Sequence, residues 1–94
     1  MKNLFTIILR FADHAIIIEQ YEEKTPLEAL IRLIRHSDRL ERYDRERIEN
    51  ALSHLHHSTV DRGVWTFVCN DISTLVLGGI IIQTDKSAYL RPHH

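Results

Sequence analysis

Histidines gather near the middle of the chain, in the run from His54 to His57. If this segment is helical, His54 and His57 lie on one helix face, three residues apart. Two such imidazoles and one further ligand could hold zinc or nickel. The candidate third ligands are His14, His36 and Asp61. Histidines in the last turn of a helix also interact favourably with its dipole. The sequence favours this dipole role over a metal site at His54 and His57.

Arginines recur at helical spacing through the next candidate region, at positions 32, 35, 39 and 42. A continuous helix would align these guanidinium groups on one face, where they could grip phosphates. Segment 26–57 nevertheless carries six arginines and six acidic residues, a balance of zero. Acids placed four residues before an arginine stabilise a solvated helix by about 0.2–0.5 kcal/mol per pair. The two such pairs are Asp38–Arg42 and Glu41–Arg45.

A mixed-charge outer face is therefore the favoured interpretation of the row Arg32–Arg42. Charge-based recognition of a protein comes second. The residues that would carry it are Arg35, Arg39, Arg42 and Tyr43. Nucleic-acid binding comes third, because the whole chain has a net charge of −1 and offers no general attraction to a polyanion.

Two other residues could carry chemistry, and both are predicted to be structural. Cys69 is the only cysteine, so it cannot form a disulfide within the chain, and it falls inside an apolar run. Trp65 could anchor a partner, but core packing is favoured. The sequence has no Gly-rich phosphate loop, no nucleophile motif and no paired carboxylates. We therefore expect a non-enzymatic protein with no catalytic residue and no cofactor.

The chain length and composition indicate one ordinary globular domain over residues 1–94. The hydrophobic fraction is 44% and the charged fraction is 27%. The polar stretch 85–94 is expected to be a frayed tail. Arg10 and Asp13 interrupt the first apolar run, and no stretch approaches a membrane span of about 20 apolar residues. A cytoplasmic protein that does not contact a membrane is predicted.

A capped helix is the clearest local signal. Thr25 suits the N-cap, Pro26 the first helical position and Glu28 the third. An apolar stripe follows at helical spacing, with Leu27, Leu30, Ile31 and Ile34. The helix is predicted over Pro26–His36.

A second helical segment is expected between Asp38 and His57. Asp38 and Glu41 resemble a capping pair, and an intermittent helical period continues to Leu55. The pattern is consistent with one helix, or with a turn followed by a helix that opens at Asp44. Residues 58–63, rich in Ser and Thr and ending in Gly63, are predicted to form the exit loop.

Four strands are predicted from period-two alternation and β-branched residues: 4–11, 15–21, 64–70 and 74–84. The first two make a hairpin with its tip near Asp13, and the last two are joined by a turn at 70–73. Gly78-Gly79 inside the fourth strand indicates a bulge, a bend or a close approach of another backbone. The order ββααββ predicts an α+β fold, with a four-stranded antiparallel sheet and both helices packed on one face.

This architecture predicts an apolar surface on the uncovered face of the sheet. Isoleucines occupy adjacent positions in the second and fourth strands, so both sides of those strands are apolar. Two helices cover one side only. An exposed patch of this kind is typical of a dimer interface or a partner site. The alternative is that the tail, with Tyr89 and Leu90, folds over it.

Three stretches together resemble a group of small bacterial α+β proteins of unknown function, some of immunity-protein type. They are FTIILRF with AIIIEQY, TPLEAL, and the late VW strand followed by LVLGGIIIQT. Immunity proteins of this type occlude the active site of a toxin. The resemblance implies a binding role and assigns no functional residue.

The predicted function is thus a non-enzymatic protein-binding module, for which the resemblance implies an immunity or inhibitor type. It would act as a homodimer or on one protein partner, through the apolar sheet face or the charged helical face. The alternatives are a small metal-binding protein or enzyme using His54 and His57, and a nucleic-acid-binding regulator using the row Arg32–Arg42.

Overall fold

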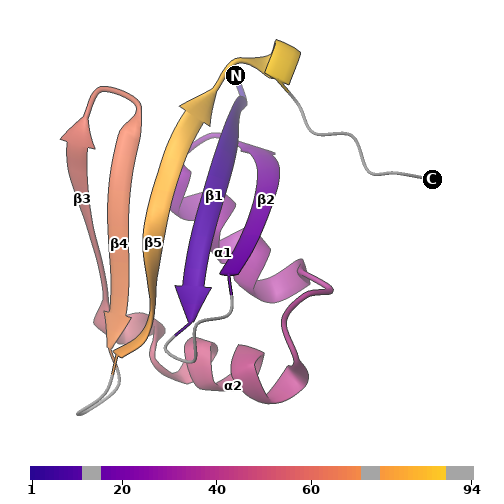
Figure 1. Ribbon diagram of the computed structural model, residues 1–94, viewed down its shortest axis with the longest axis vertical. Helices are drawn as coiled ribbons and strands as arrows, with labels where there is room; N and C mark the ends of the chain where they lie inside the picture. The colour runs from indigo at the N-terminus through magenta and orange to yellow at the C-terminus, as the bar shows by residue number, and fades with distance from the viewer. Residues whose placement is uncertain (12–15, 71–74, 89–94) are drawn as a thin grey trace.

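Five antiparallel strands form one sheet in the order β2-β1-β5-β4-β3 (Figure 1). The computed structural model describes residues 1–11, 16–70 and 75–88, and these counts refer to those residues. The strands are β1 (Asn3–Phe11), β2 (Ile16–Glu23), β3 (Leu55–Asp61), β4 (Val64–Asn70) and β5 (Leu75–Thr84). The helices are α1 (Pro26–His36) and α2 (Arg42–Asn50), with short 3-10 turns at Leu52–His54 and Lys86–Ala88.

Helix α1 begins and ends as its sequence predicts. The Thr25 side chain accepts a hydrogen bond of 3.1 Å from the backbone N–H of Glu28, and Pro26 occupies the first turn. At the other end, the backbone becomes extended at the C-cap residue Ser37, whose N–H donates a hydrogen bond to the Leu33 carbonyl. The apolar stripe of α1 then meets the sheet.

Both helices lie on the same side of the sheet, behind it in Figure 1. Helix α1 contacts β2, β1 and β5, and α2 contacts β5 and α1. The core fills the space between them. It contains Phe5, Ile7, Leu9, Ile17, Phe67, Cys69, Leu77 and Ile81 from the strands, and Ala29, Leu30, Leu33, Ile34 and Ile48 from the helices. The β3–β4 hairpin forms the side of the sheet away from β2 (Figure 1).

The α+β class and the single helix-covered face are confirmed, but the strand count is wrong. The segment predicted as a helix end and exit loop, from Leu55 to Asp61, is strand β3. Its main chain pairs with β4, which satisfies the backbone hydrogen bonds that a loop would leave to water. Because its residues after Leu55 are exposed on both faces, they carry no apolar alternation from which a strand could be predicted.

The linker between the helices resolves an alternative that the sequence left open. Residues 38–40 form a turn, and α2 starts at Arg42, with Glu41 at the N-cap but without a side-chain capping bond. Leu40 is 5% exposed and belongs to the core. Its burial anchors the turn that breaks the helical region, so the four arginines of the row do not lie on one continuous helix.

Gly79 is the point where two neighbours approach β5 most closely. A Cβ atom on Gly79 would lie 2.0 Å from the Ile8 carbonyl oxygen and 2.8 Å from the Phe67 ring. Close approach of another backbone, one of the three possibilities raised for the glycine pair, is therefore present at Gly79. Gly78 has more room, with its nearest neighbour at 3.4 Å.

Several expected features lie outside the described residues: the hairpin tip at 12–15, the turn at 71–74 and the tail at 89–94. The tail predicted from residue 85 begins with the 3-10 turn Lys86–Ala88. Within the described part of the chain, neither α-helix has the length and apolar character needed to cross a membrane.

Candidate protein-binding face

The side chains that point away from the helices form what we call the open face. Successive strand residues point to opposite sides of a sheet, so the strand register assigns each residue to a face. The open face comprises Thr6, Ile8 and Arg10 of β1; Ile16, Ile18, Gln20 and Glu22 of β2; Gly78, Ile80, Ile82 and Thr84 of β5; Val64, Thr66 and Val68 of β4; and His56 and Ser58 of β3. Leu4 has the same strand parity but is buried, with 1% of its surface exposed.

The middle of the open face is aliphatic and accessible. Ile8 pairs with Ile18 on one side and with Ile80 on the other, which makes a continuous row across three strands. Ile16 is 59% exposed, Ile18 45% and Ile80 39%. The expected apolar surface is therefore present, and isoleucines of three strands, β1, β2 and β5, contribute to it.

Polar side chains of the open face bond to one another. The Gln20 amide donates to the Thr6 hydroxyl at 3.0 Å, and the Thr84 hydroxyl donates to the Ile82 carbonyl at 3.0 Å. The Thr6 and Thr84 hydroxyl oxygens lie 2.6 Å apart. Because the Thr84 proton is directed to Ile82, Thr6 is the donor in this contact. The chain Gln20–Thr6–Thr84–Ile82 thus supplies internal partners for these groups.

Charged residues of the open face lie towards the ends of its strands. Arg10 pairs in register with Ile16 and Gly78 near one end of the sheet, and Glu22 pairs with Leu4 near the other. His56 lies on β3, the strand at the outer edge. An uncharged centre within a charged rim is the usual layout of a protein-binding surface.

The candidate metal ligands His54 and His57 do not share a helix face. His54 ends the 3-10 turn, whereas His57 lies on β3 and pairs with Phe67. His57 therefore points to the helix side of the sheet, and His56 to the open face. Among residues 1–11, 16–70 and 75–88, no three His, Cys, Asp or Glu side chains gather in a way that could hold a metal ion.

The four arginines of the row are each joined to a glutamate. The nitrogen-to-oxygen distances are 3.0 Å for Arg32–Glu23, 3.5 Å for Arg35–Glu49, 3.8 Å for Arg39–Glu19 and 3.3 Å for Arg42–Glu46. These partners differ from the Asp38 and Glu41 pairings predicted from helical spacing, because α1 ends at His36. Tyr43 stands 73% exposed on α2. The charged helical face is thus a set of compensated ion pairs with one exposed aromatic ring.

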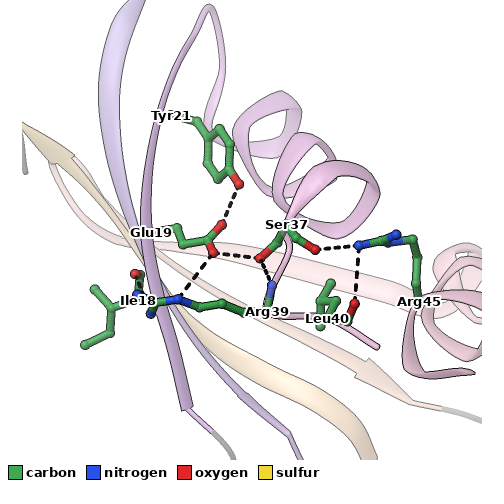
Figure 2. A network of polar contacts seen from close by, with 7 residues as sticks. All are labelled: Ile18, Glu19, Tyr21, Ser37, Arg39, Leu40 and Arg45. Atoms are coloured by element: carbon green, nitrogen blue, oxygen red, sulfur yellow. Dashed lines mark hydrogen bonds and ion pairs between the residues drawn. The ribbon is translucent and has the colours of Figure 1, made fainter. Parts of the chain in front are cut away.

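Glu19 is the centre of a polar network between β2 and the turn after α1 (Figure 2). Its carboxylate accepts hydrogen bonds from the Tyr21 hydroxyl and, at 2.6 Å, from the buried Ser37 hydroxyl. Burial and the hydrogen bond to Glu19 raise the pKa of Tyr21 above its ordinary value, while the nearby Arg32 guanidinium lowers it. The network fixes the turn against β2, so its charges serve the fold.

Arg45 has a structural role that spacing did not reveal. Its guanidinium donates to the Ile34 carbonyl at 3.0 Å. It also donates to the Ser37 carbonyl and, at 3.4 Å, to the Leu40 carbonyl (Figure 2). These carbonyls lie at and just beyond the C-terminal end of α1, where a cation is favourable. Arg45 therefore ties α2 to the end of α1.

The outer side of α1 contains a shallow hollow of about 460 Å³. Its lining residues are Glu23, Glu28, Ile31, Arg32, Arg35 and His36. Two glutamates and two arginines balance each other, and Arg32 is already bonded to Glu23. The hollow therefore has no concentrated charge that would select an ionic ligand.

Cys69 and Trp65 lie where core packing predicts. Cys69 is completely buried, and its thiol donates to the Ala51 carbonyl at 3.1 Å. The Trp65 ring packs edge-on against Phe5, with ring centroids 5.8 Å apart, and is partly buried. Neither residue offers a reactive group to solvent.

Besides Arg45, the sequence did not reveal the roles of Glu19 and Ser37. Glu19 shares strand parity with Ile17 and Tyr21, which was a signal that its carboxylate faces the helices. No comparable signal marks Ser37, whose burial depends on the tertiary contact. In comparisons with known proteins, no family model, no curated protein and no solved structure matches this chain.

Proposed function

We propose that this chain is a non-enzymatic protein-binding module whose contact surface is the open face. The observation that carries the proposal is the exposure of Ile16, Ile18 and Ile80 around Ile8, in one aliphatic patch across the β2-β1-β5 part of the sheet. Contiguous apolar surface of this kind is characteristic of sites that are covered by another molecule.

The charged helical face supports binding less well. Arg35, Arg39 and Arg42 already have glutamate partners within the chain, so a ligand would have to compete for them. Exposed ion pairs contribute little net energy, and exchanging them gains little. By contrast, covering the isoleucines releases water from apolar area at about 25 cal/mol per Å².

Within this class we infer an inhibitor or immunity role in the cytoplasm, on the strength of the sequence resemblance. Such a protein acts by occluding its target. If a toxin is encoded beside the gene, cells expressing the wild-type chain would survive the toxin. Cells expressing a chain with a disrupted open face would not survive.

Native complex size in the source cells tests the binding function. The wild-type chain at its natural expression level should elute above its 11.1 kDa monomer mass. The double variant Ile18→Lys/Ile80→Lys should elute as the monomer, because two charges would stand in the apolar centre. Tyr43→Lys, which changes an exposed ring on α2, is the matched control and should leave the complex intact.

Two results would contradict the proposal. One is a wild-type chain that elutes as a free monomer at its natural level. The other is a complex that survives the double variant and is lost with Tyr43→Lys, which would transfer the binding role to the charged helical face.

A further inference from the structure

We propose that the partner covering the open face is a second copy of this chain, so that two sheets pack face to face as a two-fold symmetric β-sandwich. This inference rests on the proposed function and names the partner. Four observations support it: the side-chain types in the centre of the face, its internal hydrogen bonds, the state of the two sheet edges, and the available area.

The side-chain types favour a permanent, self-associating interface. On the three inner strands, the central positions of the open face are held by Thr6 and Ile8, by Ile80 and Ile82, and by Val64, Thr66 and Val68. All are β-branched. Transient interfaces are enriched in aromatic residues and arginine, which act as anchors. Homodimer interfaces are more apolar and resemble a domain core cut in half, and this face has that composition.

The hydrogen bonds of the face favour an apolar partner surface. Covering a polar group costs free energy unless it keeps a hydrogen-bond partner. Gln20, Thr6 and Thr84 already bond in a chain that ends on the Ile82 carbonyl. A partner therefore needs no polar group to satisfy the Thr6 and Thr84 hydroxyls. The same aliphatic face of a second copy meets that requirement.

Each of the two sheet edges is protected against pairing with a further strand, whereas the open face is free of such protection against packing on another surface. At the β2 edge, Arg39 and Arg32 donate to the Ile18 and Glu22 carbonyls, both at 3.4 Å. At the β3 edge, the register with β4 shifts between Thr59 and Asp61, an irregularity that works against adding another strand. Association through the face is therefore favoured over extension of the sheet.

The area of the face suits a dimer. Five strands at about 4.8 Å spacing and eight residues at about 3.3 Å rise give a surface of about 600 Å² per copy. Two copies would bury about 1,200 Å², at the lower limit of standard stable interfaces. A second copy covers the whole face.

Symmetry places Ile80 at the centre. β5 is the middle strand of the five, and Ile80 lies within it with Ile8 and Thr66 as its direct neighbours. A two-fold axis near Ile80 brings the same patch of each copy together, as an isologous contact requires. Twisted sheets pack in this way with their strands about 30° apart and about 10 Å between the sheets.

The mass of the purified full chain, measured by sedimentation from about 1 to 300 µM, tests the dimer. The wild-type chain should have twice its 11.1 kDa monomer mass at the upper concentrations. Ile80→Lys should raise the dissociation constant by at least about 100-fold, because two lysines would meet at the axis without a counter-charge. Tyr43→Lys should leave it unchanged. Ile80 is already 39% exposed, so the lysine is compatible with the folded monomer, and circular dichroism verifies this.

Cross-linking gives a second, independent measurement. In Ile80→Cys, a short bis-maleimide should join two copies through the new thiol. The native Cys69 is buried and does not compete. Tyr43→Cys should give no cross-linked dimer under the same conditions.

A wild-type chain that stays monomeric throughout this range overturns the inference, and so does a dimer that Ile80→Lys leaves unchanged. If the purified chain is monomeric but the native complex in cells still depends on Ile18 and Ile80, the partner is a different protein and the proposed function stands. If both are monomeric, the proposed function fails as well.

Discussion

Neighbouring isoleucines on the same strand of this sheet differ in burial, because they lie on opposite faces. Ile81 is 1% exposed and Ile80 is 39% exposed, although they are adjacent on β5. On β2, Ile17 is 4% exposed and Ile18 is 45% exposed. Side-chain chemistry is identical within each pair, so the difference comes from the face on which each residue lies, because the helices cover the side of Ile17 and Ile81. Hydrophobicity alone therefore predicts that these residues lie in an apolar environment. It does not predict whether the helices of the same chain or another molecule provide that environment.

The strongest test of the comparison uses the two glycines of β5, which also point to opposite faces. Gly79→Ala should destabilise the fold by at least about 4 kcal/mol, because the new Cβ meets the Ile8 carbonyl oxygen and the Phe67 ring. Gly78→Ala should change stability by less than about 1 kcal/mol, since its surroundings lie at ordinary contact distance. Urea unfolding at low protein concentration measures both. Equal effects would show that the two faces do not differ in packing.

The isoleucine pair on β5 provides the next test. Ile81→Ala should cost about 3 kcal/mol, since it leaves a cavity beneath the helices. Ile80→Ala should cost less than about 1 kcal/mol in the monomer, where the side chain is partly in water. If the open face is a dimer interface, the loss of stability caused by Ile80→Ala should increase with protein concentration. The loss caused by Ile81→Ala should increase less. Denaturation at two concentrations separates these outcomes.

A third test examines the helix layer that creates the difference between the faces. Arg45→Ala should cost about 2 kcal/mol, because charge-assisted bonds to the end of α1 are lost. Arg42→Ala should lower the free energy of unfolding by less than about 0.5 kcal/mol, because the Arg42 side chain is 93% exposed and forms an i,i+4 ion pair with Glu46 on the same helix. Thermal melts of the two variants measure both losses of stability. A larger loss for Arg42→Ala than for Arg45→Ala would contradict the structural role of Arg45.

The smallest expected effect is a change in the pH dependence of stability, caused by Tyr21 on the helix-covered face. Burial and the bond to Glu19 raise the pKa of Tyr21, so the folded chain holds the phenol proton more tightly than the unfolded chain. The corresponding stability is fully present below about pH 10, the unfolded value, and is lost as the pH rises above it. Tyr21→Phe should therefore show a shallower loss of stability between pH 9 and 11 than the wild-type chain. Parallel slopes in urea unfolding would argue against this role.

The capped helix and the covered strands could be predicted because their signals are local. Thr25, Pro26 and Glu28 specify a helix start whatever surrounds them, and α1 has the predicted bounds. The burial of Cys69 followed from the apolar run around it. Strand β3 could not be predicted in this way, because its polar residues are held by pairing with β4 and not by burial. The candidate face was predicted in outline, from strands that are apolar on both sides.

The sequence by itself determined the α+β class, the Pro26–His36 helix and the excess of aliphatic side chains, because each follows from short-range periodicity and capping. The tertiary structure alone decided which isoleucine of each pair is covered and which glutamate pairs with each arginine. It also decided that Leu55–Asp61 is a strand. These outcomes depend on contacts between residues far apart in the chain, and neither spacing nor composition encodes such contacts locally. The open face is the product of both: the sequence supplies its isoleucines, and the placement of two helices on the opposite side leaves them exposed.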